Sequence, residues 1–145
     1  MVPHELMQFL RSGLEAKVEA RRHMRRVEAL ESLCTRVTAP PQSLPGGGGV
    51  DRETLLASLA DARTEAERAV QAELAQYRTV EGFIAGLPDP TSRIVLRLRC
   101  LEGRSWADVQ RSLYEDGVYY SERHLRRLYR RALDEAQERW EAVRR

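Results

Sequence analysis

The stretch that decides the fold is residues 121–140, which reads SERHLRRLYRRALDEAQERW. Its apolar residues recur at steps of three and four, the period of one face of an α-helix. Ser121 stands before this pattern and is a typical N-cap, because its hydroxyl can accept a hydrogen bond from a free N–H of the first turn. The predicted core face consists of Leu125, Leu128, Ala132, Ala136, Trp140 and Val143.

The other faces of this helix are rich in arginine. They carry Glu122, Arg123, Arg126, Arg127, Arg130 and Arg131. A recognition helix enters the major groove of DNA with its N-terminal residues at the base edges, where arginine pairs with guanine, and other arginines reach phosphates. We expect Arg130 and Arg131, one turn further along, to contact phosphates, and His124 to be a surface or phosphate contact.

A shorter helix is predicted to begin at Asp89-Pro90, where a capping side chain precedes a proline at the first helical position. Gly103 is a typical stop for it. Ser105 and Asp108 then resemble a capping box and predict a second short helix. The residues expected to be buried in the two helices are Ile94, Val95, Leu98, Leu101, Trp106, Val109 and Leu113.

These three helices predict a helix-turn-helix DNA-binding domain in residues 89–145. Its turn, at residues 114–120, is about seven residues long, where a compact helix-turn-helix uses three or four. Basic charge is concentrated in this domain, since residues 91–131 hold ten arginines against five acidic residues, whereas residues 50–90 hold four against eight. A local excess of positive charge is typical of a surface that binds phosphates.

Residues 1–88 predict two long helices. The apolar stripe of the first comprises Leu6, Leu10, Leu14, Val18, Met24, Val27, Leu30 and Cys34. That of the second, which Asp51 caps and Pro88 ends, comprises Leu55, Leu59, Ala62, Ala66, Val70, Leu74, Tyr77, Val80, Ile84 and Leu87. Neither stripe has a globular core of its own, so we expect an antiparallel hairpin within one chain or between two.

The hairpin is expected to form a helical, coiled-coil stem that assembles the chain into a homo-oligomer, either a dimer or a tetramer. Its two helices are joined by a predicted loop at residues 36–50, which holds three prolines and four consecutive glycines. Proline removes amide donors and glycine maximises backbone entropy, so a regular element is not expected there. The predicted fold class is therefore all-α, with a stem at 1–88 and a three-helix module at 89–145.

Catalysis is not expected. His4, His23 and His124 are far apart in sequence and show no metal-ligand spacing, and no nucleophile with a base is evident. Cys34 and Cys100 each sit in an apolar helical pattern and are expected to be small buried hydrophobes. Neither a cofactor nor a metal is expected. No apolar stretch approaches the roughly 20 residues of a membrane span, which predicts a soluble, cytoplasmic protein.

Several segments resemble a known family, the phage transcriptional regulators of the RinA and ArpU type, whose C-terminal module is similar to region four of bacterial sigma factors. The segments are LPDP at 87–90, RIVLRLR at 93–99, LEGRSWAD at 101–108, YSERHLRRLYRRAL at 120–133 and TAPP at 38–41. The resemblance covers nearly the whole chain and implies a bacterial host. It implies that Ser121 is the first position of the recognition helix and that the base-reading candidates are Glu122, Arg123, Arg126 and Arg127.

The expected function is a sequence-specific regulator of transcription that binds duplex DNA and is encoded by a phage or prophage, with RNA polymerase as a further candidate partner. Two alternatives remain open. One is a DNA-packaging adaptor similar to a terminase small subunit, which a large subunit ring would favour over a dimer or tetramer. The other is a helical interaction module whose arginines bind an acidic partner such as RNA polymerase.

Overall fold

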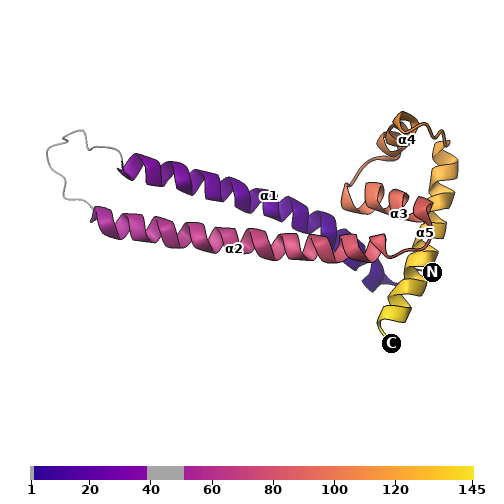
Figure 1. Cartoon of the computed structure of the whole chain (residues 1–145), viewed down its shortest axis with the longest axis horizontal. Helices are drawn as coiled ribbons and strands as arrows, with labels where there is room; N and C mark the ends of the chain where they lie inside the picture. Colours follow the sequence, from indigo (N-terminus) through magenta and orange to yellow (C-terminus); the bar gives the residue numbers. More distant parts are fainter. Residues whose placement is uncertain (1, 39–50) are drawn as a thin grey trace. The chain divides into compact units, whose positions relative to one another are not determined.

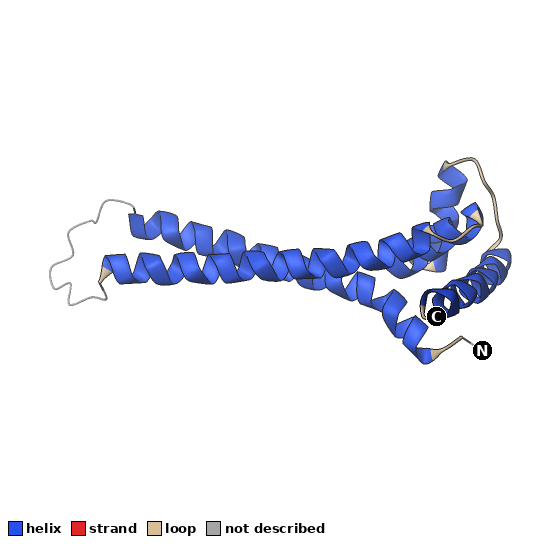
Figure 2. Ribbon diagram, turned by 60° about the horizontal axis from the view of Figure 1, so that its bottom comes forward, coloured by secondary structure: helices blue, strands red, loops and turns tan. Residues whose placement is uncertain are grey.

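The computed structural model describes residues 2–38 and 51–145, and every regular element within them is a helix, as the sequence predicts (Figures 1 and 2). The elements are α1 (His4–Thr38), α2 (Arg52–Ala85), α3 (Pro90–Leu96), the π-helical turn η1 (Arg97–Leu101), α4 (Trp106–Glu115) and α5 (Glu122–Val143). Helix α1 continues into the start of the predicted loop, and residues 39–50 of that loop lie outside the described residues. No helix in the described part of the chain is long and apolar enough to cross a membrane.

The chain divides into two compact units. One comprises Met1–Lys17 and Ala75–Arg145, and the other comprises Val18–Leu74. The division therefore differs from the predicted one at residue 88, because the start of α1 and the end of α2 belong with the C-terminal helices. We call these the C-terminal unit and the hairpin unit.

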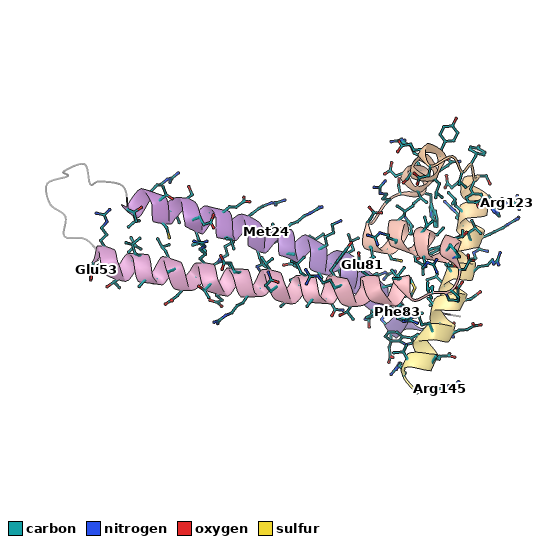
Figure 3. All side chains as sticks on the ribbon, viewed as in Figure 1. Met24, Glu53, Glu81, Phe83, Arg123 and Arg145 are labelled. Carbon is teal, nitrogen blue, oxygen red and sulfur yellow. The ribbon has the colours of Figure 1, made fainter. Side chains whose placement is uncertain are left out.

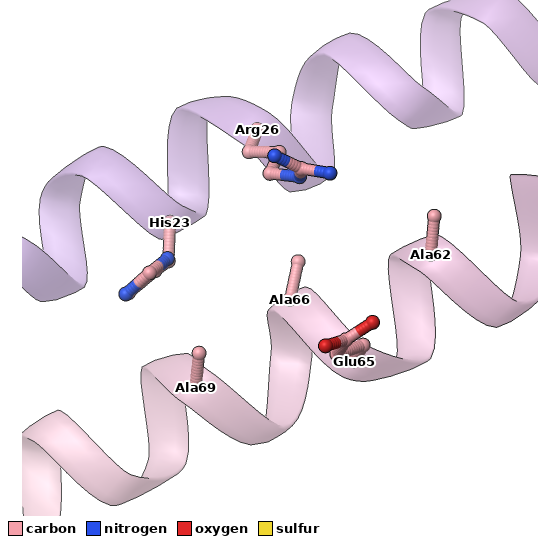
Figure 4. A pocket seen from close by; sticks show the side chains of 6 residues that line it. All are labelled: His23, Arg26, Ala62, Glu65, Ala66 and Ala69. Carbon is pink, nitrogen blue, oxygen red and sulfur yellow. The ribbon is translucent and has the colours of Figure 1, made fainter.

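The hairpin unit consists of two antiparallel helical segments that lie side by side (Figures 1 and 2). Asp51 caps α2 as predicted, since its carboxylate accepts a hydrogen bond from the Glu53 N–H at 3.2 Å. Alanine dominates the seam, in which Ala20, Ala66 and Val70 are buried. Small side chains let the two helices approach closely, and they leave a shallow hollow of about 210 Å³ beside Ala66 (Figure 4).

The predicted stripes of the hairpin are partly wrong. Val18, Met24 and Leu55 are exposed, at 46%, 49% and 36%. The seam of α1 passes instead through smaller residues, because Ala16 and Ala20 replace the longer side chains on the buried face. From residue 59 onward, the predicted apolar positions of α2 are buried or half-buried.

The C-terminal unit has a main core to which α1, α2, α3, η1 and α5 contribute. It comprises Leu6, Leu10, Val80, Phe83, Ile84, Leu87, Leu96, Cys100, Leu101, Ala132, Leu133 and Ala136. Phe9, Phe83 and Trp140 pack as an aromatic trio at its edge, with ring centroids 5.0 to 6.0 Å apart. Trp140 is thus a core anchor, whereas Val143, which the sequence predicted on the same face, is 63% exposed because α5 projects beyond its partners there.

A smaller core joins η1, α4 and α5. Leu98, Val109, Leu113 and Leu125 are buried in it, with Trp106, Tyr120 and Leu128 packed around them. These contacts hold α5 against α4. Most of the residues that the sequence predicted to be buried in the two short helices are indeed buried. Ile94 is the exception, at 46% exposed, because Val95 and Leu96 take the buried face of α3.

Glu135 ties α5 to the beginning of α3. Its carboxylate accepts hydrogen bonds from the Asp89 N–H at 2.9 Å and from the Ser92 hydroxyl at 2.8 Å. Asp89 in turn caps α3 by accepting from the Thr91 N–H at 3.0 Å. Ser92, which is buried, therefore has its polar group satisfied, and α5 is anchored at its middle as well as at its apolar face.

Candidate nucleic-acid interface

Helix α5 begins at a well-formed cap. The backbone of Ser121 is extended, and its hydroxyl accepts a hydrogen bond from the His124 N–H at 3.1 Å. The Ser121 carbonyl accepts from the Leu125 N–H at 2.9 Å and so starts the helical ladder. This cap fixes the first turn of α5, where two of the predicted base-reading residues, Glu122 and Arg123, lie.

The turn before α5 is also defined by its backbone. Gly117 has φ of +86°, a conformation that glycine adopts at little cost. Its N–H donates to the Tyr114 carbonyl at 3.0 Å, and the Val118 N–H donates to the Leu113 carbonyl at 2.9 Å. This pair of bonds is the Schellman motif, which satisfies the last carbonyls of α4. The turn is longer than in a compact helix-turn-helix, yet its first half is ordered by the end of α4.

Polar side chains stabilise the beginning of α4 and connect the helix to the same turn. Ser105 caps it as predicted, since its hydroxyl accepts from the Asp108 N–H at 3.2 Å. The Gln110 side-chain amide donates to the Tyr120 carbonyl at 2.9 Å, one residue before the α5 cap. Sequence reasoning missed Gln110, because neither periodicity nor a capping pattern singles it out. The start of α5 is thereby fixed from both α4 and the turn.

Five arginines form one exposed surface on α5, which we call the arginine face. It comprises Arg123, Arg126, Arg127, Arg130 and Arg131, all exposed. With 3.6 residues per turn, these positions span roughly 140° of the helix circumference, opposite the buried residues. Arg123 extends from α5 away from α3 and α4 (Figure 3). The face is therefore free to meet a large partner.

Most of the arginine face is not neutralised. Arg126 pairs with Glu122 one turn before it, at 2.8 Å between nitrogen and oxygen. Within the described residues, the other four arginines of the face form no ion pair with an acidic side chain. Glu122 is thus engaged with Arg126, and the uncompensated charge lies at Arg123, Arg127, Arg130 and Arg131.

The positive charge ends abruptly along the helix. Asp134, Glu138 and Glu141 continue the same face after Arg131, and all three are exposed. At a rise of 1.5 Å per residue, the basic segment 122–131 is about 15 Å long. Acidic Glu115 ends α4, and acidic Asp116 follows it at the start of the turn before α5. A polyanion is therefore attracted to the N-terminal half of α5 and repelled beyond it.

All eight predicted contact residues lie on this first part of α5 or at its cap. Glu122, Ser121 and His124 are exposed together with the arginine face. Two of them also make contacts within the chain. Ser121 accepts the cap hydrogen bond, and the His124 ring packs on the Tyr120 ring, with centroids 5.0 Å apart. The side chains of Arg123 and Arg127 have no such local contact among the described residues.

The two cysteines differ in burial. Cys100 is buried, as predicted, and burial raises the pKa of its thiol. Cys34 is only half-buried, contrary to the prediction. Among the described residues, no group of three histidine, cysteine or acidic side chains could hold a metal ion.

Comparisons of the chain with protein-family models, with curated proteins and with solved structures find no match. Its function is therefore inferred from its own residues and their geometry.

Replacing Ser121 by alanine is expected to cost about 1 kcal/mol in the free energy of unfolding, because the His124 N–H loses its acceptor. Ser121→Asp should keep most of that stability, since a carboxylate also caps. The midpoint of urea unfolding measures both. Equal midpoints for the wild-type chain and Ser121→Ala would show that the cap does not stabilise α5.

Proposed function

We propose that this chain binds duplex DNA, with α5 as the recognition helix of a helix-turn-helix, and regulates transcription. The observation that carries this proposal is the arginine face, which is exposed on a capped helix and largely free of acidic partners. Opposite charges one turn apart on a helix surface stabilise the helix, as Glu122 and Arg126 do. Within the described residues the remaining four arginines have no acidic partner, so their charge is available to a polyanion such as DNA.

The dimensions of the face fit a major groove. A groove about 12 Å wide admits one α-helix, whose diameter with side chains is about 10–12 Å, and the basic segment extends for about 15 Å along the axis of α5. The acidic residues from Asp134 onward would lie outside the groove, where they limit contact to the first half of the helix. Recognition helices contact bases through this same half.

The roles of the arginines follow from their place along the helix. Arg123 and Arg127 lie one turn apart in the first half and suit bidentate contacts to guanine. Arg130 and Arg131 follow them and suit phosphates. Arg126 sits at one border of the face in its pair with Glu122, so its guanidinium is better placed for a phosphate beside the groove than for a base.

The exposed apolar side chains of the hairpin unit favour an oligomer of the chain. Its two segments bury few residues fully, and several apolar side chains, Met24 and Leu33 among them, stay exposed. A two-helix unit of this kind gains stability by covering such side chains with a second copy. A dimer or tetramer would also present two or more recognition helices to one DNA site, as most regulators of this class do.

The proposal also includes the host of the protein and its partner. By its resemblance to RinA- and ArpU-type regulators, we assign the chain to a phage or prophage of a bacterial host, and RNA polymerase is the partner through which a bound regulator would act. The three capped helices α3, α4 and α5, of which α4 and α5 share one small core with η1, are compatible with the sigma region-four module of that family.

Selection of duplexes from a random pool, at two salt concentrations, tests the function. We expect a short enriched motif, and weaker recovery at the higher salt because counterions compete for the phosphates. Salt-dependent recovery without an enriched motif would contradict sequence-specific regulation. Failure to retain any duplex at the lower salt would contradict DNA binding and favour the protein-interaction alternative.

A further inference from the structure

A second basic region lies away from the arginine face, in the C-terminal unit. It is a hollow of about 410 Å³ between the beginning of α1, η1 and α5, which we call the basic hollow. Its polar lining comes from Arg11, Glu15, Arg99, Cys100 and Tyr129. Tyr129 lies about 120° around α5 from the centre of the arginine face, so the hollow opens on a different side of that helix.

Two guanidinium groups converge at the hollow. Arg11 and Arg99 both line the hollow, together with Cys100 and Tyr129. Neither arginine forms an ion pair within the part of the chain that the structure describes. Glu15 contributes one negative charge to the lining, so the hollow keeps a net positive charge.

Arg99 is fixed in place before any ligand arrives. Its guanidinium lies 4.6 Å from the centroid of the Trp106 ring, and one of its N–H groups donates to the Arg104 carbonyl at 2.6 Å. Trp106 packs edge-on against the Tyr129 ring, with centroids 5.3 Å apart. The cost of ordering this long side chain is therefore met within the folded chain, which favours binding of an anion.

The floor of the hollow offers hydrogen-bond donors. The Tyr129 hydroxyl and the Cys100 thiol interact with each other, and burial raises the pKa of Tyr129 to about 12 and that of Cys100 above its usual value. Both groups are thus protonated at neutral pH, and since one proton serves the hydrogen bond between them, the other can be donated to an oxyanion. Guanidinium groups bind phosphate oxygens through paired N–H donors, which suits Arg11 and Arg99.

We propose that the basic hollow binds a phosphate group, held by Arg11 and Arg99 with Tyr129 as a further donor. The phosphate belongs either to a small phosphorylated molecule or to the backbone of bound DNA. A volume of about 410 Å³ accommodates more than the phosphate itself, and Met7 and Leu14 give the hollow an apolar side. The site does not depend on the DNA-binding proposal, because its geometry involves no residue of the arginine face.

Titration of the full chain with pyrophosphate tests the site, observed through the arginine Nε–Hε signals in an NMR spectrum. Saturable shifts are expected at Arg11 and Arg99. Arg11→Gln should weaken binding about tenfold or more, whereas Arg21→Gln, an exposed arginine of α1 outside the hollow, should leave it unchanged. Glu15→Gln should strengthen binding. Unchanged signals at Arg11 and Arg99, or equal affinity in Arg11→Gln, would overturn the proposal.

A second measurement, of the affinity for duplex DNA, distinguishes the two sources of phosphate. If DNA supplies it, Arg11→Gln should lower the affinity for duplex DNA and reduce the salt slope by roughly one unit. If a small molecule supplies it, Arg11→Gln should leave DNA affinity unchanged while pyrophosphate binding is still lost. Should the chain bind no DNA at all, the pyrophosphate titration still decides whether the site exists.

Discussion

Replacing Arg123 and Arg127 together by alanine is expected to weaken binding to the selected duplex by about thirtyfold or more. Each bidentate contact to a base contributes about 1–3 kcal/mol, and tenfold corresponds to about 1.4 kcal/mol. Both side chains are exposed and unpaired within the described residues, so their loss should not unfold the chain. Fluorescence anisotropy measures the affinity, and circular dichroism verifies that helix content is unchanged.

The matched control is the pair Arg21 and Arg25 on α1. These two arginines have the same i,i+4 spacing, are exposed, and form no ion pair among the described residues. Alanine at both removes the same charge from the chain, yet it should change affinity only slightly. Equal losses in the two double variants would mean that net charge, rather than the arginine face, governs binding.

The largest loss of stability is expected from Leu101→Ala, at about 2–5 kcal/mol in the free energy of unfolding. Leu101 is fully buried in the main core. A methyl group built on Gly13 would come within 2.8 Å of its side chain, so α1 packs directly on it. Truncation leaves a cavity that the surrounding helices can fill only in part. Urea unfolding followed by circular dichroism measures the loss.

Ile94→Ala is the control for this loss, since the sequence pattern also placed Ile94 on the buried face. Its side chain is 46% exposed, so its truncation should cost much less than that of Leu101. A comparable cost for both variants would show that α3 is oriented differently and that Ile94 enters the core.

The sequence predicted correctly those features of the fold that depend only on residues close together in the chain. Asp51, Asp89, Ser105 and Ser121 each cap the helix predicted for them, because a capping hydrogen bond involves only residues two or three positions away. The period of the apolar residues likewise predicted the two long helices, which extend over His4–Thr38 and Arg52–Ala85.

The errors arise where a neighbouring element decides burial. Periodicity gives a helix an apolar face, but it does not say which of two adjacent apolar residues the partner covers. Thus Val95 is buried and Ile94 is exposed, and on α1 the small Ala16 and Ala20 occupy the seam in place of Val18. Close packing selects the side chain that fits the available gap, which is a property of two helices together.

Contacts between distant segments were not predictable from one sequence. The hydrogen bonds of the Glu135 carboxylate with Ser92 and Asp89 join residues more than forty positions apart, and no local sequence pattern indicates them. The same is true of the basic hollow, whose two arginines come from α1 and η1. The arginine face, by contrast, follows from helical period alone, and for this reason the sequence placed it correctly on the exposed side of α5.

The most direct test of DNA binding by α5 is an NMR spectrum of the arginine Nε–Hε groups of the full chain, recorded with and without the selected duplex. We expect Arg123, Arg127 and Arg130 to shift and broaden, and Arg21 and Arg25 to stay where they are. Shifts confined to Arg21 and Arg25, or a spectrum that the duplex leaves unchanged, would contradict the assignment of α5 as the recognition helix.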